Sequence, residues 1–136
     1  MAGALKSRTL KITISATSLI VILLSIFVYF EIVVPHNTLR DLEWWEQASA
    51  EEQRQVAHQI LRYPVGNHHD AFLILTEFGN SESIPYLLNG LKWYEFFNRG
   101  EDFILYSRDH CLDALRKITG KDLGTKYTDW KDIDTY

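Results

Sequence analysis

One long apolar run lies near the N-terminus, and apolar residues in the rest of the chain recur at helical spacing. Residues 12–30 contain no charged side chain and lie between Lys11 and Glu31. As an α-helix, this run would extend about 28 Å at about 1.5 Å per residue, close to the roughly 30 Å hydrocarbon core of a bilayer. The pattern therefore predicts a transmembrane helix, placed at residues 12–34 after an N-terminal tail of residues 1–11.

Two alternatives, a cleaved signal peptide and a buried core helix, fit this run less well. The apolar region of a signal peptide usually has about 7–15 residues and ends at a small-x-small cleavage site. Here the run is longer, and no small residue follows until Thr38. A core helix of so small a domain would seldom lack charge over such a length. We therefore expect a single-pass anchor.

Charge on the two sides of the run sets its expected orientation. Lys6, Arg8 and Lys11 precede it, and Glu31 follows it. Because positively charged flanks stay in the cytoplasm, the tail should be cytoplasmic. The rest of the chain should be extracytoplasmic, which means periplasmic in a Gram-negative cell. The single cysteine cannot form an intrachain disulfide, so the domain must depend on its core.

Directly after the run, a short element is expected to connect the anchor with the domain. Leu39, Leu42 and Trp45 keep helical spacing, and Pro35 precedes them. We interpret residues 35–48 as a juxtamembrane helix or stalk that continues the anchor after a break at Pro35. The remaining residues, 49–136, form the predicted domain.

Helix start and stop signals are clear in the first half of this domain. Ser49 and Glu52 have the S-x-x-E spacing of a capping box. Asn67 can cap a helix over about residues 68–78, and Gly79-Asn80 can end it. Two short antiparallel helices are therefore expected here.

The second half of the domain shows the same signals, with one interruption. A helix is expected after Ser81 or Ser83, and another from Ser107 to Gly120. The aromatic-rich residues 94–106 between them are interpreted as a loop or a short extended pair. No alternating β-pattern competes over this length, so the predicted fold class is all-α.

The C-terminal motifs follow an order that resembles a known family. Residues 111–124 read CLDALRKITGKDLG, and Trp130 follows. An Ala-Leu helix, then Thr-Gly, a further Gly and a closing Trp resemble the last repeat of bacterial HEAT-repeat proteins. In that last repeat, Leu123 stands where an aromatic residue is usual. Residues 78–88 are similar to the internal repeats of the same proteins. The resemblance covers residues 68–131 and implies a HEAT-like array of antiparallel helices that binds another protein.

Histidines form the most suggestive cluster for chemistry. His68 and His69 are adjacent, and adjacent residues on a helix point about 100° apart, so one helix cannot direct both rings to one metal. Zinc sites favour histidines spaced on a common face. His58 or His110 can join them only through the fold. We therefore expect no metal and no cofactor, and interpret the cluster as a polar helix start.

Other chemistry is also weakly supported by the sequence. Cys111 shares a helical face with Leu115 and Ile118 and has no paired base in sequence, so it is interpreted as a buried structural cysteine. No catalytic residue is proposed, and we expect no enzyme activity. Nucleic-acid binding is also disfavoured, because the 14 Lys and Arg fall to 11 without the three in the N-terminal tail, against 18 acids.

The aromatic residues are the remaining candidates for function. Adjacent aromatic residues on a helix cannot all face one core, so some should be exposed and available to a partner. The candidate partner-binding residues are Trp44, Trp45, Trp93, Tyr94, Phe96, Phe97, Phe103 and Tyr106.

Three functions remain open from the sequence. The first is a membrane-anchored adaptor or scaffold whose extracytoplasmic HEAT-like domain binds a protein. The second is a small accessory subunit of a membrane complex, recognised through its transmembrane helix. The third is a metal-binding or lyase-type enzyme built around His68, His69 or Cys111.

Overall fold

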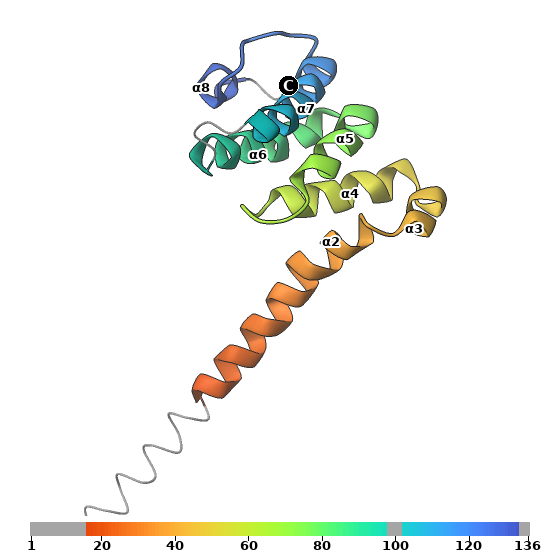
Figure 1. Ribbon diagram of the computed structural model, residues 1–136, viewed down its shortest axis with the longest axis vertical. Coiled ribbons are helices and arrows are strands. Elements are labelled where there is room, and N and C mark those ends of the chain that lie inside the picture. The colour runs from red at the N-terminus through yellow and green to blue at the C-terminus, as the bar shows by residue number, and fades with distance from the viewer. Residues whose placement is uncertain (1–15, 98–101, 134–136) are drawn as a thin grey trace, which may run out of the picture.

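The computed structural model describes residues 16–97 and 102–133, and over these residues all regular structure is helical. One long N-terminal helix projects from a group of shorter helices that pack together at its C-terminal end (Figure 1). The predicted all-α class, with an apolar N-terminal helix followed by a helical array, is therefore confirmed.

The N-terminal helix extends from Ala16 to Thr38 and is long and apolar enough to cross a membrane. It includes a π-helix, η1 (Tyr29–Val33), and then α2 (Val34–Thr38). The first N–H of α2 donates to the carbonyl of Tyr29. This wider turn precedes Pro35, which has no N–H to donate and is accepted in the first turn of a helix. The expected break at Pro35 is thus a π turn within a continuous helix.

The expected helix around Leu39, Leu42 and Trp45 is divided in two. A turn follows α2, and α3 (Leu42–Gln47) begins after Asp41, whose carboxylate accepts hydrogen bonds from two N–H groups at its start. Leu39 is buried in the core, whereas Leu42 is 80% exposed. The prediction of one element was wrong because the Asp41 cap starts a new helix within the apolar spacing.

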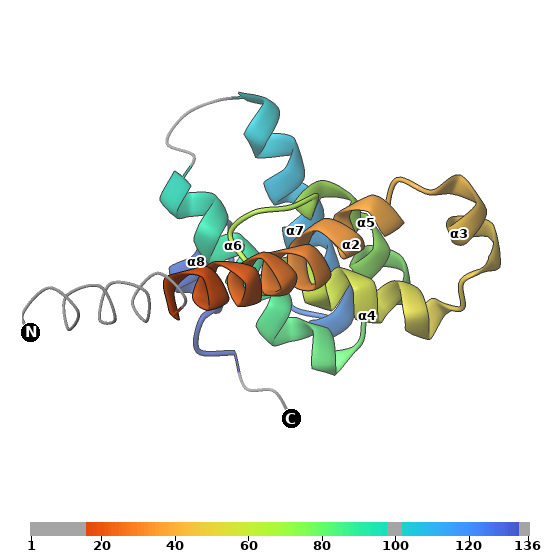
Figure 2. The same ribbon diagram turned by 90° about the horizontal axis from the view of Figure 1, so that it is seen from below.

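The remaining helices build the core. They are α4 (Ala50–Leu61), α5 (His68–Phe78), η2 (Ser81–Ser83), α6 (Ile84–Phe97), α7 (Asp102–Thr119) and α8 (Tyr127–Trp130). Helix α5 packs between α4 and α7, α7 also contacts α6, and α2 and η1 pack on α4. The same grouping is seen from below in Figure 2.

Three of the local start and stop signals in the sequence are confirmed: the Ser49–Glu52 capping box, the Asn67 cap and the stop at Gly120. The Ser49 hydroxyl accepts from the N–H of Glu52, and the Glu52 carboxylate accepts from the N–H of Ser49 at 2.8 Å. Asn67 caps α5 through the N–H of Asp70. Gly120 follows α7 with a positive φ of 67°, a conformation that glycine adopts without steric cost.

Fully buried side chains from α4 to α8 form one core. The Trp130 indole closes it, and its Nε1 donates to the Gly124 carbonyl at 2.9 Å. The largest fully buried residues include Leu61, Phe72, Ile74, Leu75, Leu87, Leu91, Cys111, Leu112, Leu115 and Trp130.

The interpretation of residues 94–106 as a loop or extended pair was wrong. Residues up to Phe97 belong to α6, and α7 begins at Asp102, so Ser107 lies inside α7 and does not cap it. The dense aromatic residues obscured the helical period, and packing of α6 on α7 stabilises both helices beyond their local signals.

Candidate functional site

A polar pocket lies along one side of α4. Its volume is about 370 Å³. One face of α4 forms most of its lining, with residues at helical spacing, and η2 and α6 supply the opposite side. The lining residues of this α4 pocket are Glu51, Arg54, Gln55, His58, Gln59, Arg62, Glu82 and Tyr86.

His58 forms the inner wall of the α4 pocket. Its Nε2 lies 2.8 Å from the hydroxyl oxygen of the buried Ser83, and its ring stacks on Tyr86 at 4.1 Å between centroids. Only 8% of the residue is exposed. Burial, together with the positive charge of Arg54, lowers the pKa of His58 to about 4, against the opposing charge of Glu82. His58 is therefore neutral near pH 7.

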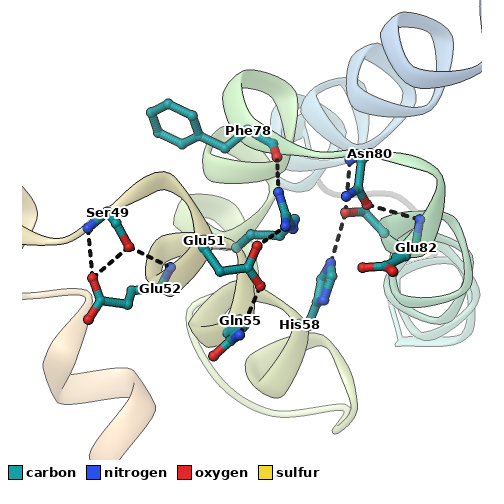
Figure 3. A network of polar contacts seen from close by, with 10 residues as sticks. Ser49, Glu51, Glu52, Gln55, His58, Phe78, Asn80 and Glu82 are labelled. Atoms are coloured by element: carbon teal, nitrogen blue, oxygen red, sulfur yellow. Dashed lines mark hydrogen bonds and ion pairs between the residues drawn. The ribbon is translucent and has the colours of Figure 1, made fainter.

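Two arginines that line the pocket, Arg54 of α4 and Arg62 directly after its last residue, have different surroundings. Arg54 pairs with Glu51 and also donates to the carbonyl of Phe78 at 3.3 Å (Figure 3). Arg62 instead lies with its guanidinium carbon 5.9 Å from the centroid of the Tyr86 ring. Within the described residues, Arg62 forms no ion pair. The pocket therefore presents one cation beside an aromatic ring for an external group.

Glu82 gives the other side of the pocket its charge. The backbone N–H of Glu82 donates to the Asn80 side-chain oxygen at 2.9 Å. This hydrogen bond positions Glu82 in the η2 turn, on the side of the pocket opposite α4. The Asn80 N–H in turn donates to Ser83 at 3.2 Å (Figure 3). An acidic group of a ligand would thus meet Arg62, and a basic group Glu82. The arrangement suits polar binding.

The predicted histidine pair diverges, as the helical angle requires. The His68 ring contacts the Tyr63 carbonyl at 2.9 Å, and burial lowers its pKa. His69 lies on the other side, beside Tyr106 and 5.1 Å from His110 between centroids. The fold thus brings His69 and His110 together. Among the described residues, however, no group of three potential ligands is placed to hold a metal ion.

Cys111 is buried on α7, as predicted. Its Sγ donates to the Leu87 carbonyl at 3.3 Å. Burial raises the pKa of the thiol, which keeps it protonated and unreactive. Cys111 therefore contributes to the core through packing and one hydrogen bond.

The predicted aromatic residues divide by exposure. Phe96 and Tyr106 are 66% and 60% exposed. The Trp45 indole donates to the Leu39 carbonyl at 2.8 Å, and Trp44 also packs on the core. Trp93 and Tyr94 are half-buried, and the pKa of Tyr94 is raised to about 12 by burial. The side chains of Phe97 and Phe103 lie outside the described residues.

The α4 pocket was missed from the sequence. Its one local signal is the stripe of polar residues at helical spacing from Glu51 to Arg62, which also fits an ordinary solvated helix face. The pocket forms because His58 contacts Ser83 and Tyr86. Ser83 is 25 residues further along the chain, beyond the whole of α5.

Comparison with known proteins finds no family model, no curated protein and no solved structure that matches this chain.

Proposed function

We propose that this chain is a membrane-anchored binding module whose helical domain holds a segment of a partner protein outside the cytoplasm. The N-terminal helix supports the anchor, because its apolar side chains from Leu19 to Ile26 are exposed rather than packed on the domain. Lys6, Arg8 and Lys11 before the helix support a cytoplasmic N-terminus.

The observation that carries the binding role is Arg62 beside Tyr86 at the α4 pocket. Arginine and tyrosine are enriched among residues that dominate protein interfaces. The guanidinium is exposed, lies over the aromatic ring and has no acidic partner among the described residues. An acidic side chain of a partner would form a charge-assisted hydrogen bond with the Arg62 guanidinium. The HEAT-like order of motifs is consistent with a protein-binding role.

A second candidate, an accessory subunit recognised through its membrane helix, is favoured by one feature of that helix. A shallow apolar groove follows one face of it, lined by Val21, Leu24, Ser25, Val28, Tyr29 and Val33. The Ser25 hydroxyl bonds to the Val21 carbonyl at 2.9 Å, so its polar group is satisfied without a partner. The groove therefore suits apolar helix packing.

Co-purification from native membranes in mild detergent, after crosslinking, tests the proposal. We expect a stoichiometric partner with the wild-type chain and its loss with Arg62→Glu. Lys117→Glu is the matched control, because Lys117 is an exposed cation on α7 that does not line the pocket. Retained binding in Arg62→Glu would contradict the pocket as the contact.

Replacing residues 12–30 with an unrelated apolar helix separates the two candidates. A binding module should keep its partner after this exchange, whereas an accessory subunit should lose it. If the wild-type chain retains no partner even after crosslinking, both interaction roles are contradicted.

A further inference from the structure

The domain touches the N-terminal helix at the level where the apolar run ends. The Gln59 amide donates to the carbonyl of Phe30 at 3.2 Å, and the Tyr63 hydroxyl donates to Glu31 at 3.1 Å. The Tyr63 ring also meets the ring of Phe27 edge to face, with 6.0 Å between centroids. One tyrosine of the domain therefore contacts both the first charged residue after the run and an apolar residue within it.

These contacts fix the depth of Tyr63 relative to a bilayer. Phe27 precedes Glu31 by four residues, which corresponds to about 6 Å along a helix at about 1.5 Å per residue. If the apolar run fills the hydrocarbon core, the Tyr63 ring lies at the boundary between hydrocarbon and headgroups. Tyrosine is enriched at this boundary, where its ring is apolar and its hydroxyl is hydrated.

The α4–α5 loop (residues 62–67) continues from Tyr63 at the same level. Val65 is two residues further, so its Cα is within about 7 Å of the Cα of Tyr63. The interfacial layer on each side of the hydrocarbon core is about 5–7 Å thick. Val65 is 52% exposed, and Pro64 beside it is also exposed. Figures 1 and 2 both show this loop beside the C-terminal half of the N-terminal helix.

We infer that the α4–α5 loop lies in the interfacial layer of the membrane and forms a second lipid contact next to the helix. The inference rests on the anchoring role proposed above and adds a lipid-binding surface to it. The apolar Pro64 and Val65 face the boundary between acyl chains and headgroups. As a consequence, the end of the α4 pocket formed by Gln59 and Arg62 opens close to the membrane surface.

Depth-dependent quenching in vesicles tests this placement. An environment-sensitive NBD fluorophore is attached to Val65→Cys in the full chain, which is reconstituted in phosphatidylcholine vesicles that carry nitroxides on the headgroup, high on the acyl chain or near the end of the acyl chain. Leu42→Cys is the matched control, since Leu42 is an exposed aliphatic residue on α3, beyond the C-terminal end of the N-terminal helix (Figure 1). Ile22→Cys reports whether the helix itself is inserted. The buried Cys111 should remain unlabelled, which the wild-type chain verifies.

We expect blue-shifted NBD emission at Val65 and at Ile22, with quenching at Val65 by the two shallow nitroxides and at Ile22 by the deep one. At Leu42 we expect emission typical of water and little quenching. Quenching at Ile22 with Val65 equal to Leu42 would overturn the lipid contact and leave the anchor intact. Absence of quenching at Ile22 would remove both the anchor and the lipid contact. Circular dichroism of each labelled variant confirms that the helical fold is retained.

Discussion

Acid should destabilise this domain through His58, and the structure gives the magnitude. The ordinary pKa of 6.5 applies to His58 in the unfolded chain, whereas burial and Arg54 lower it to about 4 in the folded chain. Between these values the unfolded state binds a proton that the folded state does not, so stability is lost as pH falls through this window. At about 1.4 kcal/mol per pH unit, the full loss is about 3 kcal/mol. This is a large share of the stability of a small domain.

The groups around His58 explain why protonation is unfavourable in the folded state. The ring is stacked on Tyr86 and hydrogen-bonded to Ser83, and only 8% of the residue is exposed. Arg54 and Arg62 repel the imidazolium, and Glu82 attracts it without reversing the shift. His58 should therefore take up its proton mainly in molecules in which the contact between α4 and η2 has opened.

Urea unfolding in detergent micelles measures this loss, with tryptophan fluorescence as the readout and the pH varied from about 7 to about 4. His58→Gln is the informative variant, because an amide can keep the hydrogen bond to Ser83 but does not titrate. Its free energy of unfolding should fall much less over the same window. Burial also lowers the pKa of His68. The parallel variant His68→Gln therefore measures how much of the acid-induced loss of stability comes from that histidine. Equal losses in the wild type and His58→Gln would refute the reasoning.

Two further substitutions test the packing around this site. Ser83→Ala removes the partner of His58 and of the Asn80 N–H, so we expect a loss of about 1–3 kcal/mol in the free energy of unfolding; the exposed Ser81→Ala, in the same turn, should change it by less than about 0.5 kcal/mol. Gly90→Ala places a Cβ 2.7 Å from the Phe72 ring, and this crowding, at about 1–3 kcal/mol, should outweigh the roughly 1 kcal/mol helix gain of alanine. Thermal melts should show that Phe72→Leu relieves much of this loss in the double variant, and strict additivity would contradict the crowding.

Features that depend on neighbouring residues in sequence were predictable. The capping box of Ser49 and Glu52, the Asn67 cap and the end of α7 at Gly120 are each formed by residues within four positions of one another. The all-α class and the apolar N-terminal helix follow from periodicity and composition in the same way. Such signals act before any tertiary contact forms, so a single sequence contains them.

Features that depend on distant contacts were not predictable. Helical spacing alone joined Leu39 and Leu42, but the fold buries one and exposes the other. Helix α7 begins at Asp102 and packs against α6. The local signal at Ser107 pointed to a later start, because packing between two helices is not visible in the sequence around either end. The α4 pocket requires Ser83 and Tyr86 to meet His58, and nothing local to α4 identifies either partner.

The position of α4 connects the N-terminal helix to the pocket. At its C-terminal end, Gln59 bonds to the carbonyl of Phe30, and Tyr63, just beyond it, bonds to Glu31. Gln59 also lines the pocket, together with Arg54 and His58 of the same helix. Leu39, just after α2, is buried in the same core, so the N-terminal helix is joined to the domain by packing as well as by the chain. A domain fragment designed for binding studies should therefore begin before Pro35, because a later start would remove residues that pack on α4 and shift the helix that forms the pocket.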